Sequence, residues 1–177
     1  MKKFFYLLVI VCLMSVASAC RNQNYNKLLP GTYDYSSSIP VEEDDELTMS
    51  AVIEGTVTFN SDNTFSETGK LKFKLSYLYE DYYNTLVLLY NYKSEGSWKI
   101  DGDNLVENVK ECELTLEDTD ATYYDDFYDI LTDMITHYTD GFKSEILGPA
   151  SFSIKSIDEE NLVLIDEDGN KTVYVRK

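Results

Sequence analysis

A two-residue alternation running from Glu46 to Tyr77 constrains this chain more than any other feature. Every odd position of 47–59 is apolar or Gly. After the turn-forming residues 60–63, apolar side chains again fall on alternate positions, now against Thr and Lys. Successive side chains of a strand point to opposite faces, whereas a helix would scatter this pattern around its circumference. The segment therefore predicts a long β-hairpin with one apolar and one polar face.

Further strands are expected on both sides of the hairpin, separated by Gly, Asn, Asp and Ser. A short first strand at 31–35 precedes a polar loop at 36–45. A third long strand begins near Thr85, and a returning strand at 105–117 loses its phase around 107–111, which indicates a bulge. Three short strands close the chain at 150–157, 162–165 and 171–176. Eight consecutive antiparallel strands predict a mainly β fold, an eight-stranded up-and-down barrel without exposed edges.

One helix interrupts the series of strands. Apolar residues recur at intervals of three and four in the segment 119–139, which is typical of an amphipathic helix. Residues 118–120 offer N-cap side chains, and Gly141 is a plausible stop. The pattern therefore predicts one helix inserted between strands five and six.

The helix also needs a place to bury its apolar face. Residues 86–90 are apolar on both faces of their strand, so their outer face requires a cover. We expect the helix to pack on the outside of the sheet over Val87 and Leu89, because each surface lacks an apolar partner.

The N-terminal residues have the pattern of an export signal. Lys2 and Lys3 precede an apolar run from Phe4 to Val16 and the small residues before Cys20. This order predicts a secretory signal peptide at 1–19, whose apolar core is too short for a stable membrane span.

Small residues directly before a Cys resemble the bacterial lipobox, in which the Cys thiol is acylated. The resemblance implies lipid attachment at Cys20, a tether at 20–27, and anchoring to the outer membrane. Surface-exported lipoproteins of Bacteroidetes type carry an acidic run after the Cys. Residues 21–27 begin without acidic side chains and do not resemble that signal, which favours the periplasmic face. Cleavage after Ala19 by ordinary signal peptidase, without acylation, stays open.

Charge limits the range of partners. Without residues 1–19 the chain has 13 basic and 32 acidic residues, a formal net charge of −19. Such a surface repels nucleic acid and anionic head groups. The acidic run 42–46 and the row Asp125, Asp129 and Asp133 are either solvated or bind a cation. Cys112 has no partner for a disulfide, so a buried, inert thiol is expected.

Several segments resemble exported lipocalin-like proteins of Bacteroidetes. They are Gly31-Thr32-Tyr33, the hairpin segment 55–65, Gly96-Ser97-Trp98-Lys99-Ile100 and the ending 162–176. The resemblance covers roughly 28–117 and 150–177 and implies one lipocalin-like (calycin) β-barrel domain at 28–177. Two features depart from that family: Tyr33 stands where the lipocalin start motif has Trp, and the helix lies between strands five and six.

The sequence offers little catalytic chemistry. The single His, His137, lies at the end of the predicted helix, where its interaction with the helix C-terminus is the simplest role. No nucleophile triad, zinc pattern or phosphate-binding Gly motif accompanies it. We therefore expect no enzymatic activity, cofactor or metal. An acid-dependent hydrolase would need two carboxylates facing each other across a cleft.

Aromatic residues provide the predicted binding site. Tyr and Trp combine apolar bodies with hydrogen-bonding tips, which suits amphipathic small molecules. We expect a monomeric, lipid-anchored protein that binds a small apolar or amphipathic ligand at the barrel mouth, through Tyr77, Tyr90, Tyr92 and Trp98. The alternative is a non-enzymatic interaction or structural lipoprotein of the cell envelope, whose barrel is filled by these same rings.

Overall fold

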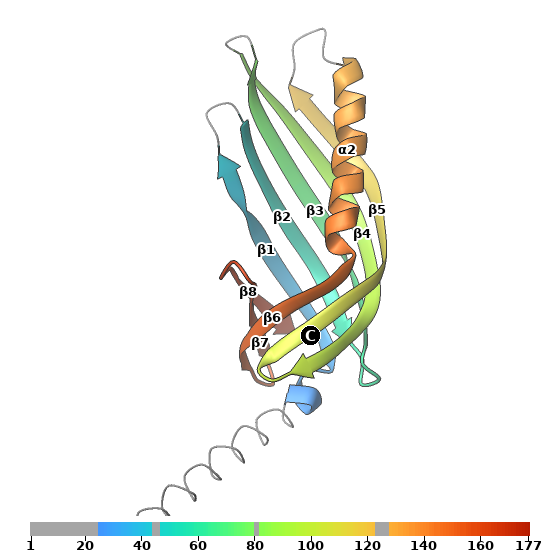
Figure 1. Ribbon diagram of the computed structural model, residues 1–177, viewed down its shortest axis with the longest axis vertical. Helices are drawn as coiled ribbons and strands as arrows, with labels where there is room; N and C mark the ends of the chain where they lie inside the picture. Colours follow the sequence, from blue (N-terminus) through green and yellow to red (C-terminus); the bar gives the residue numbers. More distant parts are fainter. Residues whose placement is uncertain (1–24, 44–46, 80–81, 123–127) are drawn as a thin grey trace, which may run out of the picture.

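The fold is mainly β. The computed structural model describes residues 25–43, 47–79, 82–122 and 128–177. Its helix α2 comprises Tyr128–Ile146 and follows the fifth strand (Figure 1). The strands are β1 (Gly31–Glu43), β2 (Leu47–Phe59), β3 (Thr64–Tyr79), β4 (Tyr82–Asp101), β5 (Asn104–Thr122), β6 (Gly148–Ile157), β7 (Asn161–Ile165) and β8 (Lys171–Arg176).

The eight strands form one closed ring. Each strand pairs antiparallel with the next, and β8 pairs with β1, so the sheet returns to its first strand. The predicted alternation between 46 and 77 is confirmed, because Val57, Phe59, Phe65 and Leu71 are buried inside the ring. The expected bulge is also confirmed: Glu95 pairs with residue 111 and Gly96 with residue 109, which leaves Lys110 extra.

Strand β1 is longer than the sequence indicated. A strand at 31–35 and a loop at 36–45 were expected, but β1 continues to Glu43. Ser36 to Ile39 pair in register with Glu54 to Ala51 on β2. The neighbouring strand thus keeps a Ser-rich segment extended, although its local composition favours a turn.

The ring is complete at one end only. Strands β6, β7 and β8 have 10, 5 and 6 residues, whereas β1 to β5 have 13 to 20. Strand β6 pairs with β5 only over 104–109, and β8 pairs with β1 only over 33–35. Beyond these positions, β1 to β5 form a trough whose missing wall is visible in Figure 1.

Helix α2 lies inside this trough, so its predicted position outside the sheet is wrong. Ile135, Tyr138 and Phe142 pack against the inner-face cluster that contains Phe73 and Tyr90. The ring centroids of Phe73 and Phe142 are 4.9 Å apart. The physical reason is the short strands, because they leave the inner face without an opposing wall and α2 buries it instead.

The predicted bounds of the helix are wrong for a related reason. Residues 118–120, expected as the N-cap, belong to β5, where they pair with Leu89, Leu88 and Val87 on β4. Gly141 lies within α2, which continues to Ile146. His137 is therefore an exposed residue in the middle of the helix and does not lie at its C-terminus.

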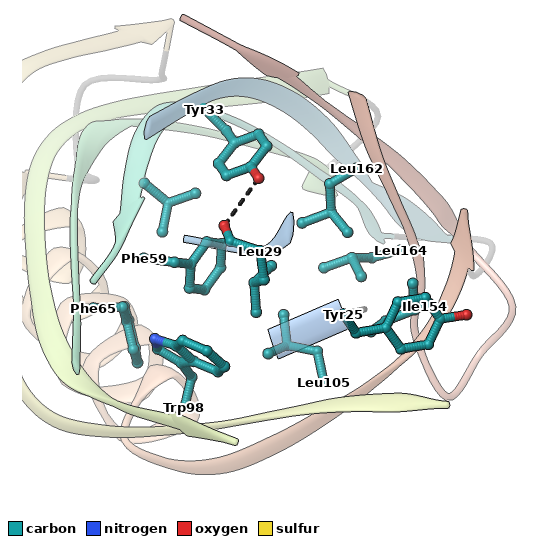
Figure 2. Packing of buried hydrophobic residues seen from close by; sticks show 11 residues of the cluster. Tyr25, Leu29, Tyr33, Phe59, Phe65, Trp98, Leu105, Ile154, Leu162 and Leu164 are labelled. Atoms are coloured by element: carbon teal, nitrogen blue, oxygen red, sulfur yellow. Dashed lines mark hydrogen bonds between the residues drawn. The ribbon is translucent and has the colours of Figure 1, made fainter. Parts of the chain in front are cut away.

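The segment before β1 closes the complete end of the ring. Residues 25–28 form a helical turn, and Tyr25 and Leu29 are buried among inward-facing side chains (Figure 2). The Tyr33 hydroxyl donates to the Leu29 carbonyl at 2.9 Å. Arg176 on β8 donates from Nη1 to the Pro30 carbonyl at 3.0 Å, and its guanidinium lies 4.8 Å from the Tyr33 ring centroid. The segment that leads into β1 and the last strand, β8, thus contact each other and stabilise this end of the ring.

The position of α2 gives a first testable prediction. Phe142→Ala removes an aromatic contact inside the trough and should lower the free energy of unfolding by about 2 kcal/mol. Leu89→Ala, on the outer face of the same sheet, should cost less than about 1 kcal/mol. Urea unfolding followed by circular dichroism measures both. A larger loss for Leu89→Ala than for Phe142→Ala would contradict the inner position of the helix.

Candidate functional site

A layer of polar side chains separates two apolar clusters inside the ring. The lower cluster contains Phe59, Trp98 and Leu105, and the upper one contains Phe73 and Leu88. Between them, polar residues occupy inward positions of β1, β3, β4, β5 and β8. We call this layer the polar waist; it consists of Tyr35, Glu67, Tyr92, Ser94, Glu107 and Tyr174.

Strand alternation puts the waist residues inside. Glu67 follows the buried Phe65 by two positions, and Glu107 follows the buried Leu105 by two. Because residues two apart on a strand share a face, both carboxylates point into the ring. Glu67 and Glu107 were not predicted as site residues. The signal for them is a Glu at a position of the strand where the alternation predicts a buried apolar residue.

Glu67 is the centre of a hydrogen-bond network. Its Oε1 accepts from the Tyr92 hydroxyl at 3.0 Å, and its Oε2 accepts from the Ser94 hydroxyl at 2.9 Å. The Tyr35 hydroxyl also donates to Oε1 and contacts the Tyr92 hydroxyl. Three hydroxyls from two strands therefore fix one carboxylate at the centre of the waist.

Two glycines allow Tyr92 to reach this network. Gly55 on β2 pairs directly with Gly69 on β3, and the Tyr92 side chain lies against both. A Cβ on Gly55 would lie 2.7 Å from the Tyr92 hydroxyl oxygen. On Gly69 it would lie 2.8 Å from the Tyr92 ring and 2.3 Å from the Glu54 carbonyl oxygen. Because neither glycine has a side chain, the aromatic ring of Tyr92 can lie directly against the backbone of β2 and β3 at this point.

Glu107 differs from Glu67 because no described residue donates a hydrogen bond to it. Burial inside the ring, together with the charge of Glu67, raises the pKa of Glu107 to about 8. Burial, followed by the charges of Glu107 and Glu67, also raises the pKa of Tyr174. The two carboxyls thus interact in one enclosed space, in different environments.

The interior is not close-packed at the waist. Tyr35, Glu67, Glu107 and Tyr174 point inward, yet each is only partly buried. By contrast, Leu105, below the waist, is completely buried at 0% exposure. Side chains in a close-packed core keep almost no accessible surface. Inward-facing groups that remain accessible therefore border space that no protein atom fills. Solvent therefore reaches these inward side chains of the waist, and we call the space beside them the hollow.

No cation of the described residues neutralises the waist. Their ion pairs all lie among partly or fully exposed side chains, and none includes Glu67 or Glu107. Lys143 of α2 lies near enough to oppose the effect of burial on Cys112, but burial prevails and raises the pKa of that thiol. As expected, Cys112 is buried and free. Within the same residues, no group of three or more His, Cys, Asp or Glu side chains is arranged to hold a metal ion.

The predicted aromatic site is dispersed in the structure. Tyr90 lies in the upper cluster with its hydroxyl 2.8 Å from Thr139 Oγ1. Trp98 lies in the lower cluster and donates from Nε1 to the Asn60 carbonyl at 3.1 Å. Only Tyr92 belongs to the waist. The backbone of Tyr77 lies in β3, but its side chain is outside the described part, as is Cys20.

Comparisons with known proteins add no assignment. No family model matches this chain, and no curated protein is similar to it. In the described residues, no helix has the length and apolar character needed to cross a membrane. The acidic row expected at Asp125, Asp129 and Asp133 can be judged only at Asp133, which is exposed, and the run 42–46 is not described beyond the backbone of 42–43.

The raised pKa of Glu107 predicts an unusual dependence of stability on pH. Between its ordinary value of 4.5 and about 8, the folded state holds a proton that the unfolded chain has released. This group therefore stabilises the fold fully below that window and loses its contribution as the pH rises through about 8.

Glu107→Gln should remove this loss. The variant should gain stability relative to the wild type as pH rises, by at most about 1.4 kcal/mol per pH unit. Urea unfolding across the window measures the difference. Glu111→Gln, an exposed change on the same strand, is the control and should run parallel to the wild type. A constant difference between Glu107→Gln and the wild type would show that Glu107 does not titrate in this way.

Proposed function

We propose that this chain is an exported, lipid-anchored, lipocalin-like protein whose barrel binds one small amphipathic ligand at the polar waist. The observation that carries the proposal is Glu107, a partly buried carboxyl that points into the ring and accepts no hydrogen bond from any described residue. A carboxyl that points into a ring is favourable only with a donor, a cation or a proton, so an inward carboxyl without a protein donor can receive one from a ligand.

The surroundings of the hollow favour an amphipathic ligand. Apolar side chains lie on both sides of the waist, from Leu105 and Ile154 below to Leu71 and Phe73 above. A ligand at this level meets hydroxyls and carboxylates in one band and apolar groups beyond it. Small-molecule sites have this composition, with a few polar groups that orient an otherwise apolar body.

The closed end of the ring suits an anchored protein. Tyr25 and Leu29 fill that end, and Arg176 holds the carbonyls of the segment that leads into β1. A tether at 20–27 would thus join the domain at its sealed end, away from the waist. We propose attachment through acylated Cys20 to the periplasmic face of the outer membrane.

A filled barrel that serves only protein interactions is the second candidate. The polar tips of Tyr90 and Trp98 are bound by protein groups, so neither ring needs a ligand. In the upper and lower clusters, therefore, the aromatic rings are better explained as filling the barrel than as binding a ligand. This explanation does not apply to Glu107, which is why the ligand-binding function is preferred.

Native mass spectrometry tests the proposed function. Protein purified from its own host should carry an extra mass that is released on denaturation. Glu107→Leu should abolish that mass, because the change removes the unpaired carboxyl and fills the hollow. Glu111→Leu, on the outer face, should retain it. A wild-type protein without bound mass, or a mass that survives Glu107→Leu, would favour the filled barrel.

The anchor has a test of its own. Cys20→Ala should move the protein from the membrane fraction to the soluble periplasmic fraction, because the acyl chains can no longer be attached. Cys112→Ala is the matched control, since that thiol is buried in the sheet. Fractionation combined with a labelled fatty acid measures both variants. Unchanged fractionation of Cys20→Ala would indicate cleavage without acylation.

A further inference from the structure

The chemistry of the waist identifies the ligand more closely, if the proposed function holds. Two carboxyls from β3 and β5 point into the ring, where the charge of Glu67 acts on Glu107, and none of the ion pairs among the described residues includes either. Enclosed carboxyls in proteins are generally paired with a cation or neutralised by a proton. The described residues supply hydroxyl donors to Glu67 but no hydrogen-bond donor to Glu107.

Aromatic rings border the same space. The Tyr35 and Tyr174 rings lie with their centroids 4.8 Å apart at an angle of 34°, and the Tyr92 hydroxyl meets that of Tyr35. Ring faces attract cations, most strongly where water is excluded. Carboxylates and tyrosine rings together make a site for a positively charged group that also carries apolar surface.

We propose that the waist binds an organic ammonium ion, with the cationic head between Glu107 and the hydroxyl network of Glu67 and its apolar body along the neighbouring core. The ammonium N–H groups donate to the Glu107 carboxylate, to which no described residue donates. Its charge is balanced by the carboxylates, and the tyrosine rings enclose it.

Other ligand classes fit less well. A divalent metal prefers several oxygen ligands at once, and the described residues contain no group of three or more acidic, His or Cys side chains for it. An anionic ligand would be repelled by the charge of Glu67. A neutral alcohol would donate a hydrogen bond but could not balance the negative charge that Glu107 acquires when it releases its proton. An organic ammonium ion therefore fits the site best, because it provides both N–H donors and a positive charge.

Internal neutralisation by α2 does not replace the ligand. Lys143 is exposed, and it forms no ion pair with Glu67 or Glu107 among the described contacts. In the empty ring Glu107 instead keeps a proton. When an ammonium ion binds, that proton leaves to the solvent, the N–H groups of the ligand take its place, and no bond of the ligand changes.

Affinity should therefore rise with pH. The ionised form of Glu107 is the one that binds, so affinity increases until the pH passes the value at which the free protein releases that proton. The titratable or charged groups around it are Tyr35 on β1, Glu67 on β3, Tyr92 on β4, Cys112 on β5, Tyr174 on β8 and Lys143 on α2. Of the two carboxyls, only Glu107 lacks hydroxyl donors, so Glu107→Gln should flatten the profile.

The experiment compares charged and neutral probes of equal shape. Phenethylammonium and 2-phenylethanol, and butylammonium and butanol, are titrated against the full mature protein by ligand-observed NMR and calorimetry. Each ammonium ion should bind about 10- to 100-fold more tightly than its alcohol. Glu107→Gln should remove that preference, while Glu111→Gln should keep it. Calcium ions should not compete with the ammonium probes.

The outcomes separate the two proposals. If alcohol and ammonium bind equally, and Glu107→Gln changes neither, the waist is a ligand site but not a cation site. If no probe binds the wild type and no ligand is retained from the host, both proposals fail together. Calcium displacing the ammonium ion would overturn the choice of an organic cation. Thermal melting of Glu107→Gln confirms that it is folded in each comparison.

Discussion

The unequal length of the strands governs the rest of this structure. Pairing between β8 and β1 ends after Tyr35, and pairing between β5 and β6 ends at Val109, so hydrogen bonds close only part of the ring. Beyond that part, apolar side chains of β2 to β4 have no opposing sheet. Burial of that surface requires another element, and α2 supplies it from within the trough. The molecule therefore uses two kinds of closure, one by strand pairing and one by packing of a helix.

The polar waist lies where these two closures meet. Below it, side chains from all parts of the ring converge on the lower cluster, and above it α2 fills the trough. Neither arrangement fills the level of Glu107 and Tyr174, whose inward side chains stay partly accessible. The hollow is thus a consequence of where β6 to β8 stop, and the hydroxyls bound to Glu67 show that polar groups there are held in a defined arrangement.

Sequence reasoning recovered the strands because a period of two directly reports which face is buried. The hairpin from Glu46 to Tyr77 and the bulge at Lys110 follow from that signal. It failed where a tertiary contact decides the outcome. Nothing in the sequence of α2 distinguishes the inner face of the sheet from the outer one, and the end of β5 follows from its pairing with β4. Glu67 and Glu107 were not predicted as site residues, although a carboxylate at a buried position of a strand costs free energy and therefore needs a compensating partner.

That cost is what makes the waist informative. A ring that only had to be stable would gain from an apolar residue in place of Glu107, since its neighbours Leu105 and Val109 already face the interior. Glu67 is different, because three hydroxyls and a path opened by Gly55 and Gly69 compensate its burial. The waist therefore contains one acid on β3 with three hydroxyl donors and one acid on β5 with no donor among the described residues. An asymmetry of this kind within a single layer is what a site for a positively charged ligand requires, because the empty site must leave one acceptor free while the rest of the layer stays fixed.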